Sequence, residues 1–189
     1  MLHAAAGLAM LLVLRGGTEA EPSLAARMAY LDTHGAAWRA GFAIWMTAGM
    51  SVLALYAWWS SAVNGRRLAV AALIVAAAGL ACDLTGEALY MRLPLLTDDA
   101  ARFEHIQRVG TVLTSVFANG FYTAAGILLT VGTPPLTYPL RALAWVVWVA
   151  GIALSICGAM GWATGLVVAS GVLFPGLVLL ALLLPRALR

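Results

Sequence analysis

The composition of this 189-residue chain excludes a soluble globular domain, because 63% of the residues are hydrophobic and only 10% are charged, whereas soluble domains carry about 25% charged residues. A mean hydropathy of +0.94, with repeated long apolar stretches, is typical of polytopic α-helical membrane proteins. The formal net charge of +3 comes from arginines without a single lysine. These arginines stand singly near expected helix ends, apart from Arg66-Arg67, which indicates topology signals rather than a nucleic-acid surface.

The apolar stretches predict a single transmembrane domain, residues 1–189, built as an all-α bundle of about six spans, with five as the alternative. The expected spans are residues 1–14, 36–60, 68–92, 106–130, 140–158 and 162–185. The first is short and ends before Arg15, and the connector after it has the pattern of a short interfacial helix. Residues 140–185 would make a helix of about 69 Å, more than twice the roughly 30 Å of a bilayer core, so we expect a reversal within 158–162 and a kink at Pro175-Gly176.

Aromatic side chains recur at helical spacing along the second expected span, and Trp38 and Trp45 belong to this stripe. Such a stripe usually packs against neighbouring helices or anchors the helix at the membrane interface. A ligand pocket lined by the rings is the alternative. We keep both tryptophans as candidate binding residues.

The third expected span carries two carboxylates, Asp83 and Glu87, inside its apolar run. One helical turn separates them, so both side chains lie on the same face. A charged carboxylate at membrane depth costs at least about 2.5 kcal/mol, and such residues face a protein interior and mark function. The alternative is a structural ion pair with Arg39, Arg92 or Arg108 that holds helices together.

The fourth expected span carries a polar stripe, because its polar residues recur every three or four positions. The members of this stripe are His105, Arg108, Thr111, Ser115, Asn119 and Tyr122. The second and fourth spans begin, and the third ends, on the same side of the membrane, which also brings His34 and Arg39 to that half. We therefore expect the acids of the third span to face the polar stripe. The candidate binding residues are Asp83, Glu87, His34, Trp38, Arg39, Trp45, Arg108, Ser115, Asn119 and Tyr122.

No metal site is predicted. His34, Glu104 and His105 offer suitable ligand atoms, but no HExxH or ExxH spacing occurs, and the adjacent Glu104 and His105 diverge by about 100° on a helix. Cys82 and Cys157 form no CxxC pair, and histidines near one membrane edge do not favour haem or chlorophyll ligation. Nucleotide-binding and nucleophile motifs are missing from the sequence. The cofactor stays unknown.

Three functions remain open from the sequence. The first is a small carrier or binding protein whose intramembrane site takes a proton, an ion or a small amphiphile. The second is an enzyme acting on a lipid-like substrate, with Asp83 or Glu87 as acid or base and His105 as partner. The third is an accessory or cofactor-holding subunit of a larger membrane complex. The expected partners are membrane lipids and possible further membrane subunits, without nucleic acid. The expected location is a bacterial inner membrane, with both termini in the cytoplasm.

Overall fold

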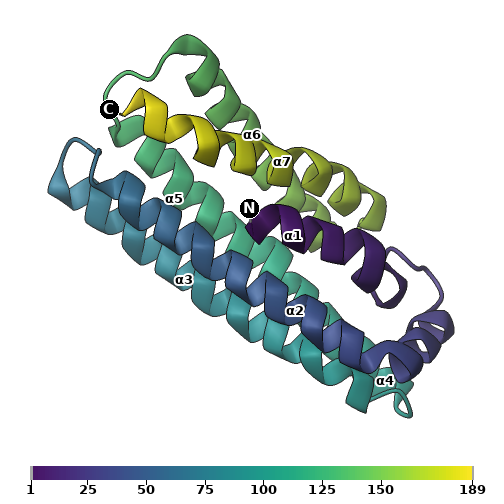
Figure 1. Cartoon of the computed structure of the whole chain (residues 1–189). Coiled ribbons are helices and arrows are strands. Elements are labelled where there is room, and N and C mark those ends of the chain that lie inside the picture. Colours follow the sequence, from purple (N-terminus) through teal and green to yellow (C-terminus); the bar gives the residue numbers. More distant parts are fainter. Residues whose placement is uncertain (1, 189) are drawn as a thin grey trace.

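Long helices lie side by side in a computed structural model that describes residues 2–188, and no strand occurs within this range (Figure 1). The elements in chain order are α1 (Leu2–Ala9) with a π-helical segment (Met10–Leu14) and a 3-10 turn (Arg15–Gly17), α2 (Leu24–Ser60), α3 (Arg66–Arg92) with a 3-10 turn (Leu93–Leu95), α4 (Ala100–Thr111), a second π-helical segment (Val112–Ala118), α5 (Asn119–Gly132), α6 (Tyr138–Met160) and α7 (Ala163–Ala187). This arrangement confirms the predicted all-α helical bundle.

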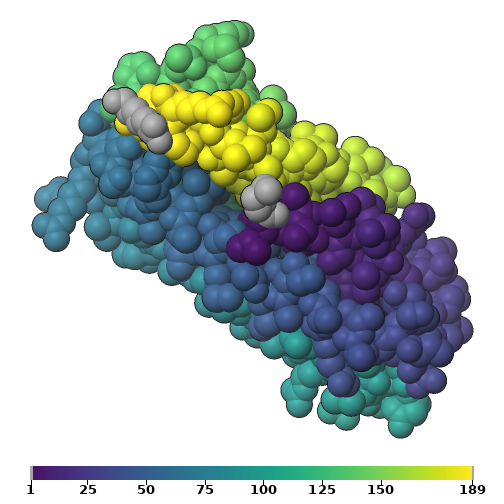
Figure 2. All heavy atoms as spheres, in the orientation of Figure 1, coloured from purple at the N-terminus to yellow at the C-terminus, as the bar shows by residue number. Residues whose placement is uncertain are grey.

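Five helical stretches are long and apolar enough to cross a membrane, which indicates an integral membrane protein. They are Leu24–Ser60, Arg66–Leu95, Ala100–Gly132, Tyr138–Met160 and Ala163–Ala187. The sixth apolar helical stretch, Leu2–Gly17, is shorter. It packs against α2 and α7, and Figure 2 shows it filling the surface between these two helices. Met1, part of the first expected span, and Arg189 lie outside the described residues.

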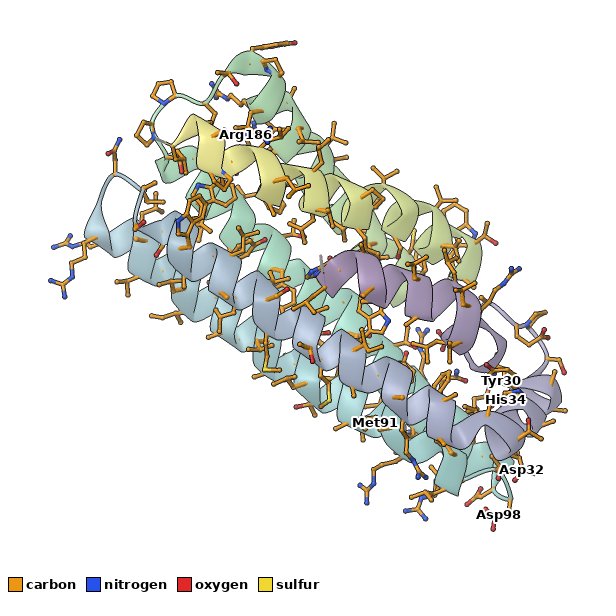
Figure 3. All side chains as sticks on the ribbon, in the orientation of Figure 1. Tyr30, Asp32, His34, Met91, Asp98 and Arg186 are labelled. Atoms are coloured by element: carbon orange, nitrogen blue, oxygen red, sulfur yellow. The ribbon has the colours of Figure 1, made fainter. Side chains whose placement is uncertain are left out.

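The two ends of the bundle differ in charge. We call the end where α2 and α4 begin and α3 ends the polar end, because its connectors and helix ends hold six of the eight acids: Glu19, Glu21, Asp32, Asp98, Asp99 and Glu104. The connectors and helix ends at the opposite end hold Arg66, Arg67, Arg141 and Arg186. Figure 3 shows this separation, with Asp32 and Asp98 at one end of the molecule and Arg186 at the other.

Two elements differ from the sequence-based expectation. The expected interfacial helix is the beginning of α2, which starts at the N-cap Ser23 and runs on through a kink at His34 (φ −116°, ψ 16°). The continuous helical stretch Ala100–Gly132, which we call the fourth helix and which joins α4 to α5, contains the π-helical segment Val112–Ala118, which the regular spacing of the polar stripe did not predict. The expected reversal occurs at Gly161, whose φ of +67° favours glycine, and α7 continues through Pro175 as one helix.

Two apolar clusters lie toward the two ends of the bundle. The larger one contains Tyr56, Trp59 and Trp148, and its indole N–H groups are satisfied by threonine hydroxyls. Trp59 donates to Thr133 at 2.8 Å and Trp148 donates to Thr130 at 2.9 Å. The smaller cluster, toward the polar end, includes Leu14, Leu31, Trp38, Phe42, Leu93 and Phe103. The carboxylates of α3 lie between the two clusters.

Candidate functional site

Close contact between α3 and the fourth helix positions the two carboxylates. A Cβ at Gly79 would lie 3.1 Å from the Ala118 carbonyl oxygen, and one at Gly86 would lie 3.1 Å from that of Gly110. These two glycines therefore let the backbones approach, as small residues do in membrane helix pairs. Asp83 and Glu87 lie on the neighbouring face of the same turns of α3.

Asp83 contacts two other helices. Its Oδ2 accepts a hydrogen bond from the Tyr122 hydroxyl of α5 at 3.3 Å. On the other side lies Gly49 of α2, where a Cβ would be 2.8 Å from the same oxygen. The carboxylate thus fits a space that the missing side chain of Gly49 leaves open. Tyr56 of α2 donates to the Tyr122 carbonyl at 3.0 Å, which fixes the turn of α5 that carries the tyrosine.

Glu87 is 3% exposed, which makes it the most deeply buried acid among residues 2–188. Its Oε2 has no hydrogen-bond partner within residues 2–188. Two of the arginines that were candidates for an ion pair bind elsewhere: Arg39 Nε donates to the Met91 carbonyl at 3.4 Å, and Arg108 Nη2 donates to the Ala159 carbonyl at 3.2 Å. The third candidate, Arg92, is exposed at the end of α3.

A series of hydrogen bonds begins at Tyr90, which follows Glu87 by three residues in α3, and leads to the polar end. The Tyr90 hydroxyl lies 2.7 Å from Thr111 Oγ1, and Thr111 donates to Glu19 Oε2 at 2.9 Å. Trp38 of α2 donates to the Tyr90 carbonyl at 2.7 Å, and the Phe42 ring stacks on Tyr90 at 4.8 Å. Trp38 therefore acts in packing and in fixing the end of α3.

The predicted polar stripe divides between two neighbours. Asn119 Nδ2 donates to the Gly151 carbonyl at 2.6 Å and to Ser155 Oγ at 2.9 Å, both on α6. Ser115 also faces α6, since a Cβ at Gly158 would lie 2.8 Å from the Ser115 Cβ. Tyr122, in contrast, faces α3. Thr111 and Tyr122 of the stripe contact α3, whereas Ser115 and Asn119 face α6, because the fourth helix packs between α3 and α6 and its π-helical turns change the angular step.

The remaining predicted residues lie away from the carboxylates. His34 is exposed and stacks on Tyr30 with ring centroids 4.3 Å apart, a pair visible at the polar end in Figure 3. The Trp45 ring contacts Phe174 of α7 at 5.1 Å, and its buried indole N–H has no partner within residues 2–188. His105 precedes Tyr122 by 17 residues of helix, roughly 20 Å or more, so the structure does not bring it to Asp83.

Sequence reasoning missed three residues of this region: Gly49, Tyr90 and Glu19. Gly49 and Tyr90 stand among similar residues of apolar helices, and Glu19 is one of several acids in a connector. The position of Asp83 at helical spacing from Tyr90 could have indicated the tyrosine, since the two residues are seven apart and share a face. Nothing in the local sequence distinguishes the other two.

The structure also contains an open pocket of about 680 Å³ at the polar end. Its polar lining residues are Glu19, Arg27, Glu104, His105, Gln107 and Arg108. Glu19 thus belongs both to this pocket and to the hydrogen-bonded series that starts at Tyr90. Within residues 2–188, no three His, Cys, Asp or Glu side chains gather closely enough to hold a metal ion.

The geometry places Asp83 in contact with α2 and α5, leaves an oxygen of Glu87 without a partner within residues 2–188, and places an open polar pocket at one end of the bundle. Comparison of the chain with protein-family models, with curated proteins and with solved structures found no match.

Proposed function

We propose that Asp83 and Glu87 form an intramembrane site that binds and releases a proton. The observation that carries this proposal is Glu87, which is 3% exposed and has an oxygen without a partner within residues 2–188, one turn from a second acid. A buried carboxylate without a compensating cation is costly in its charged form, whereas the protonated form is neutral. Two such groups one turn apart act as a coupled pair and share protons.

The surroundings of the pair support a proton over the other candidate ligands. The open pocket at the polar end has neither Asp83 nor Glu87 among its lining residues, and the same holds for a second pocket lined by Thr130, Arg141 and Trp145 at the opposite end. A small amphiphile needs such a cavity, and a metal ion needs more ligands than the pair supplies. A proton needs only an oxygen lone pair and a donor or acceptor to exchange with, such as the Tyr122 hydroxyl.

The hydrogen-bonded series from Tyr90 supports exchange with the polar end. Tyr90 follows Glu87 by three residues and lies on the same face of α3. From Asp83 to Tyr90 the path along the helix is about 10 Å at 1.5 Å per residue. Thr111 and Glu19 continue the series to the open pocket. We infer that protons reach the pair from this side of the membrane.

Infrared difference spectroscopy tests the proposal directly. The protein is reconstituted into liposomes and subjected to pH steps, and the carbonyl band of protonated carboxyl groups is followed. We expect a band in the wild type that is lost in Glu87→Gln and altered in Asp83→Asn. Asp98→Asn serves as the matched control, because Asp98 is exposed at the polar end. Spectra of Glu87→Gln that match the wild type, or equal changes in the control, would overturn the proposal.

The route is tested by rate rather than by spectrum. Tyr90→Phe removes the hydroxyl that contacts Thr111 and keeps the ring that stacks on Phe42. We expect the carboxyl band to keep its position and to respond more slowly to a pH step. An unchanged rate would exclude this route and leave the proton site itself in place.

A further inference from the structure

The open pocket at the polar end is built from four separate segments of the chain. The connector before α2 supplies Glu19, α2 supplies Arg27, α4 supplies Gln107 and Arg108, and Gly161 belongs to the turn between α6 and α7. These segments meet at the end of the bundle where the connectors are polar, which is the depth of lipid headgroups for a membrane-spanning bundle. The pocket volume is about 680 Å³.

Two lining side chains are more than nine-tenths buried and keep a hydrogen-bonding atom without a partner. Arg27 is 7% exposed; its Nη1 donates to the Glu21 carbonyl at 3.0 Å, while its Nε has no partner within residues 2–188. Gln107 is 1% exposed; its Nε2 donates to the Gly17 carbonyl at 3.0 Å, while its Oε1 has no partner in the same range. An unsatisfied buried donor or acceptor is destabilising, so both atoms indicate a missing polar partner. The donor requires an acceptor, and the acceptor requires an N–H or O–H group.

The charges of the lining residues are balanced. Arg27 and Arg108 contribute two formal positive charges, and Glu19 and Glu104 contribute two negative ones. Arginine pairs favourably with phosphate oxygens, and carboxylate and amide oxygens accept hydrogen bonds from an ammonium group. A ligand that carries both a phosphate and an ammonium group complements this lining better than a simple anion does.

We propose that this pocket binds a phosphate joined to a primary ammonium group, the chemistry shared by the headgroup of phosphatidylethanolamine and by free phosphoethanolamine. The phosphate contacts Arg27 and Arg108, and the ammonium group contacts Glu104 and Gln107. A primary ammonium is required because the trimethylammonium of phosphatidylcholine has no N–H to donate to Gln107 Oε1. This site is separate from the proton-binding pair, so either proposal can fail alone.

Two arms of one experiment distinguish the sources of the ligand. In the first, the purified protein in detergent is offered equal amounts of phosphatidylethanolamine, phosphatidylglycerol and phosphatidylcholine, and the retained lipids are identified by native mass spectrometry. In the second, phosphoethanolamine is added to the protein in phosphatidylcholine nanodiscs, and its phosphorus NMR line width is measured. The variants are Arg108→Gln and Arg27→Lys, and the control is Arg102→Gln, which removes an exposed arginine of α4 outside the pocket lining.

We expect the wild type and Arg102→Gln to prefer phosphatidylethanolamine, and Arg108→Gln to weaken this preference roughly tenfold, since it removes a charged hydrogen-bond donor to the phosphate. Arg27→Lys keeps the charge and removes Nε, so a weaker preference there shows that the arginine geometry matters even if another variant unfolds. Retention of the lipid without binding of phosphoethanolamine identifies the headgroup of an intact lipid, and binding of phosphoethanolamine identifies the free compound as sufficient. Equal retention of the three lipids without phosphoethanolamine binding, or preferences unchanged in both arginine variants, would overturn the proposal.

Discussion

Adding one methyl group at Gly49 tests how tightly α2 closes over Asp83. The Cβ of Gly49→Ala would lie 2.8 Å from Asp83 Oδ2, 3.5 Å from Leu80 Cδ1 and 3.6 Å from the Tyr122 hydroxyl. An ordinary contact between non-bonded heavy atoms is about 3.5 Å or more, so the carboxylate or α2 must move by roughly 0.7 Å. The hydrogen bond from Tyr122 is already 3.3 Å long, so a shift of the carboxylate away from Gly49 takes this bond out of range.

The expected cost follows from three contributions. Overpacking costs about 1–3 kcal/mol, and losing a side-chain hydrogen bond between membrane helices costs about 0.6 kcal/mol. Alanine offsets part of this, because it is more favourable than glycine in a helix by about 0.8–1.0 kcal/mol. We expect the free energy of unfolding to fall by about 1–2 kcal/mol. The matched control is Gly171→Ala on α7, where a Cβ would have nothing within 4 Å and the change should be neutral or stabilising.

The assay is an unfolding titration with sodium dodecyl sulfate in mixed micelles, followed by circular dichroism. Tyr122→Phe removes the hydroxyl that Gly49→Ala is expected to displace, so the double variant should cost less than the sum of the single ones. Two results would refute the reasoning: equal effects of Gly49→Ala and Gly171→Ala, or strictly additive effects of Gly49→Ala and Tyr122→Phe.

Three further predictions concern helix contacts near the site, a buried hydrogen bond in the larger cluster and the orientation of the bundle in the membrane. Asn119→Ala removes both hydrogen bonds to α6 and should lower the free energy of unfolding by about 1 kcal/mol, without changing the infrared carboxyl band; a changed band would show that Asn119 belongs to the proton site. Thr130→Val leaves the buried Trp148 indole N–H without its acceptor and should cost about 1–3 kcal/mol in the same titration, whereas Thr130→Ser should cost less; equal costs would assign the effect to packing. In a background without the two native cysteines, Asn64→Cys beside the arginine pair should react with impermeant thiol reagents from the cytoplasm and Asp98→Cys from the opposite side; the reverse pattern would invert the proposed orientation.

The helical bundle could be predicted because its signals are lengths and compositions. Residues 140–185 are too long for one crossing of a bilayer, and the reversal at Gly161 falls inside the expected segment. The side of each connector follows from counting spans, which is why the acids of the polar end could be grouped from the sequence. The contact of Asp83 with Tyr122 of the fourth helix could be predicted as well, because counting spans brings the two helices together and both residues lie on polar faces.

The partners of individual side chains could not be predicted in the same way. Ser115 and Asn119 face α6 rather than α3, because the direction of a side chain after a π-helical turn does not follow a period of 3.6 residues. Gly49 matters through the absence of a side chain, which has no pattern of its own. Glu19 reaches Thr111 from a connector whose course depends on tertiary packing, so no local rule could assign it.

The π-helical segment Val112–Ala118 lies against the turns of α3 that carry the acids. A widened stretch of helix in lipid needs its peptide groups satisfied without solvent. Here the Asn119 N–H donates to the Thr114 carbonyl, and the Thr114 hydroxyl donates to the Gly110 carbonyl at 3.0 Å. These two bonds pair carbonyls of the widened turns inside the protein, so an irregular backbone can lie beside ionisable groups at membrane depth. In the proton exchange proposed above, the groups near this segment that can pass a proton on are side-chain hydroxyls, such as those of Tyr122 and Tyr90.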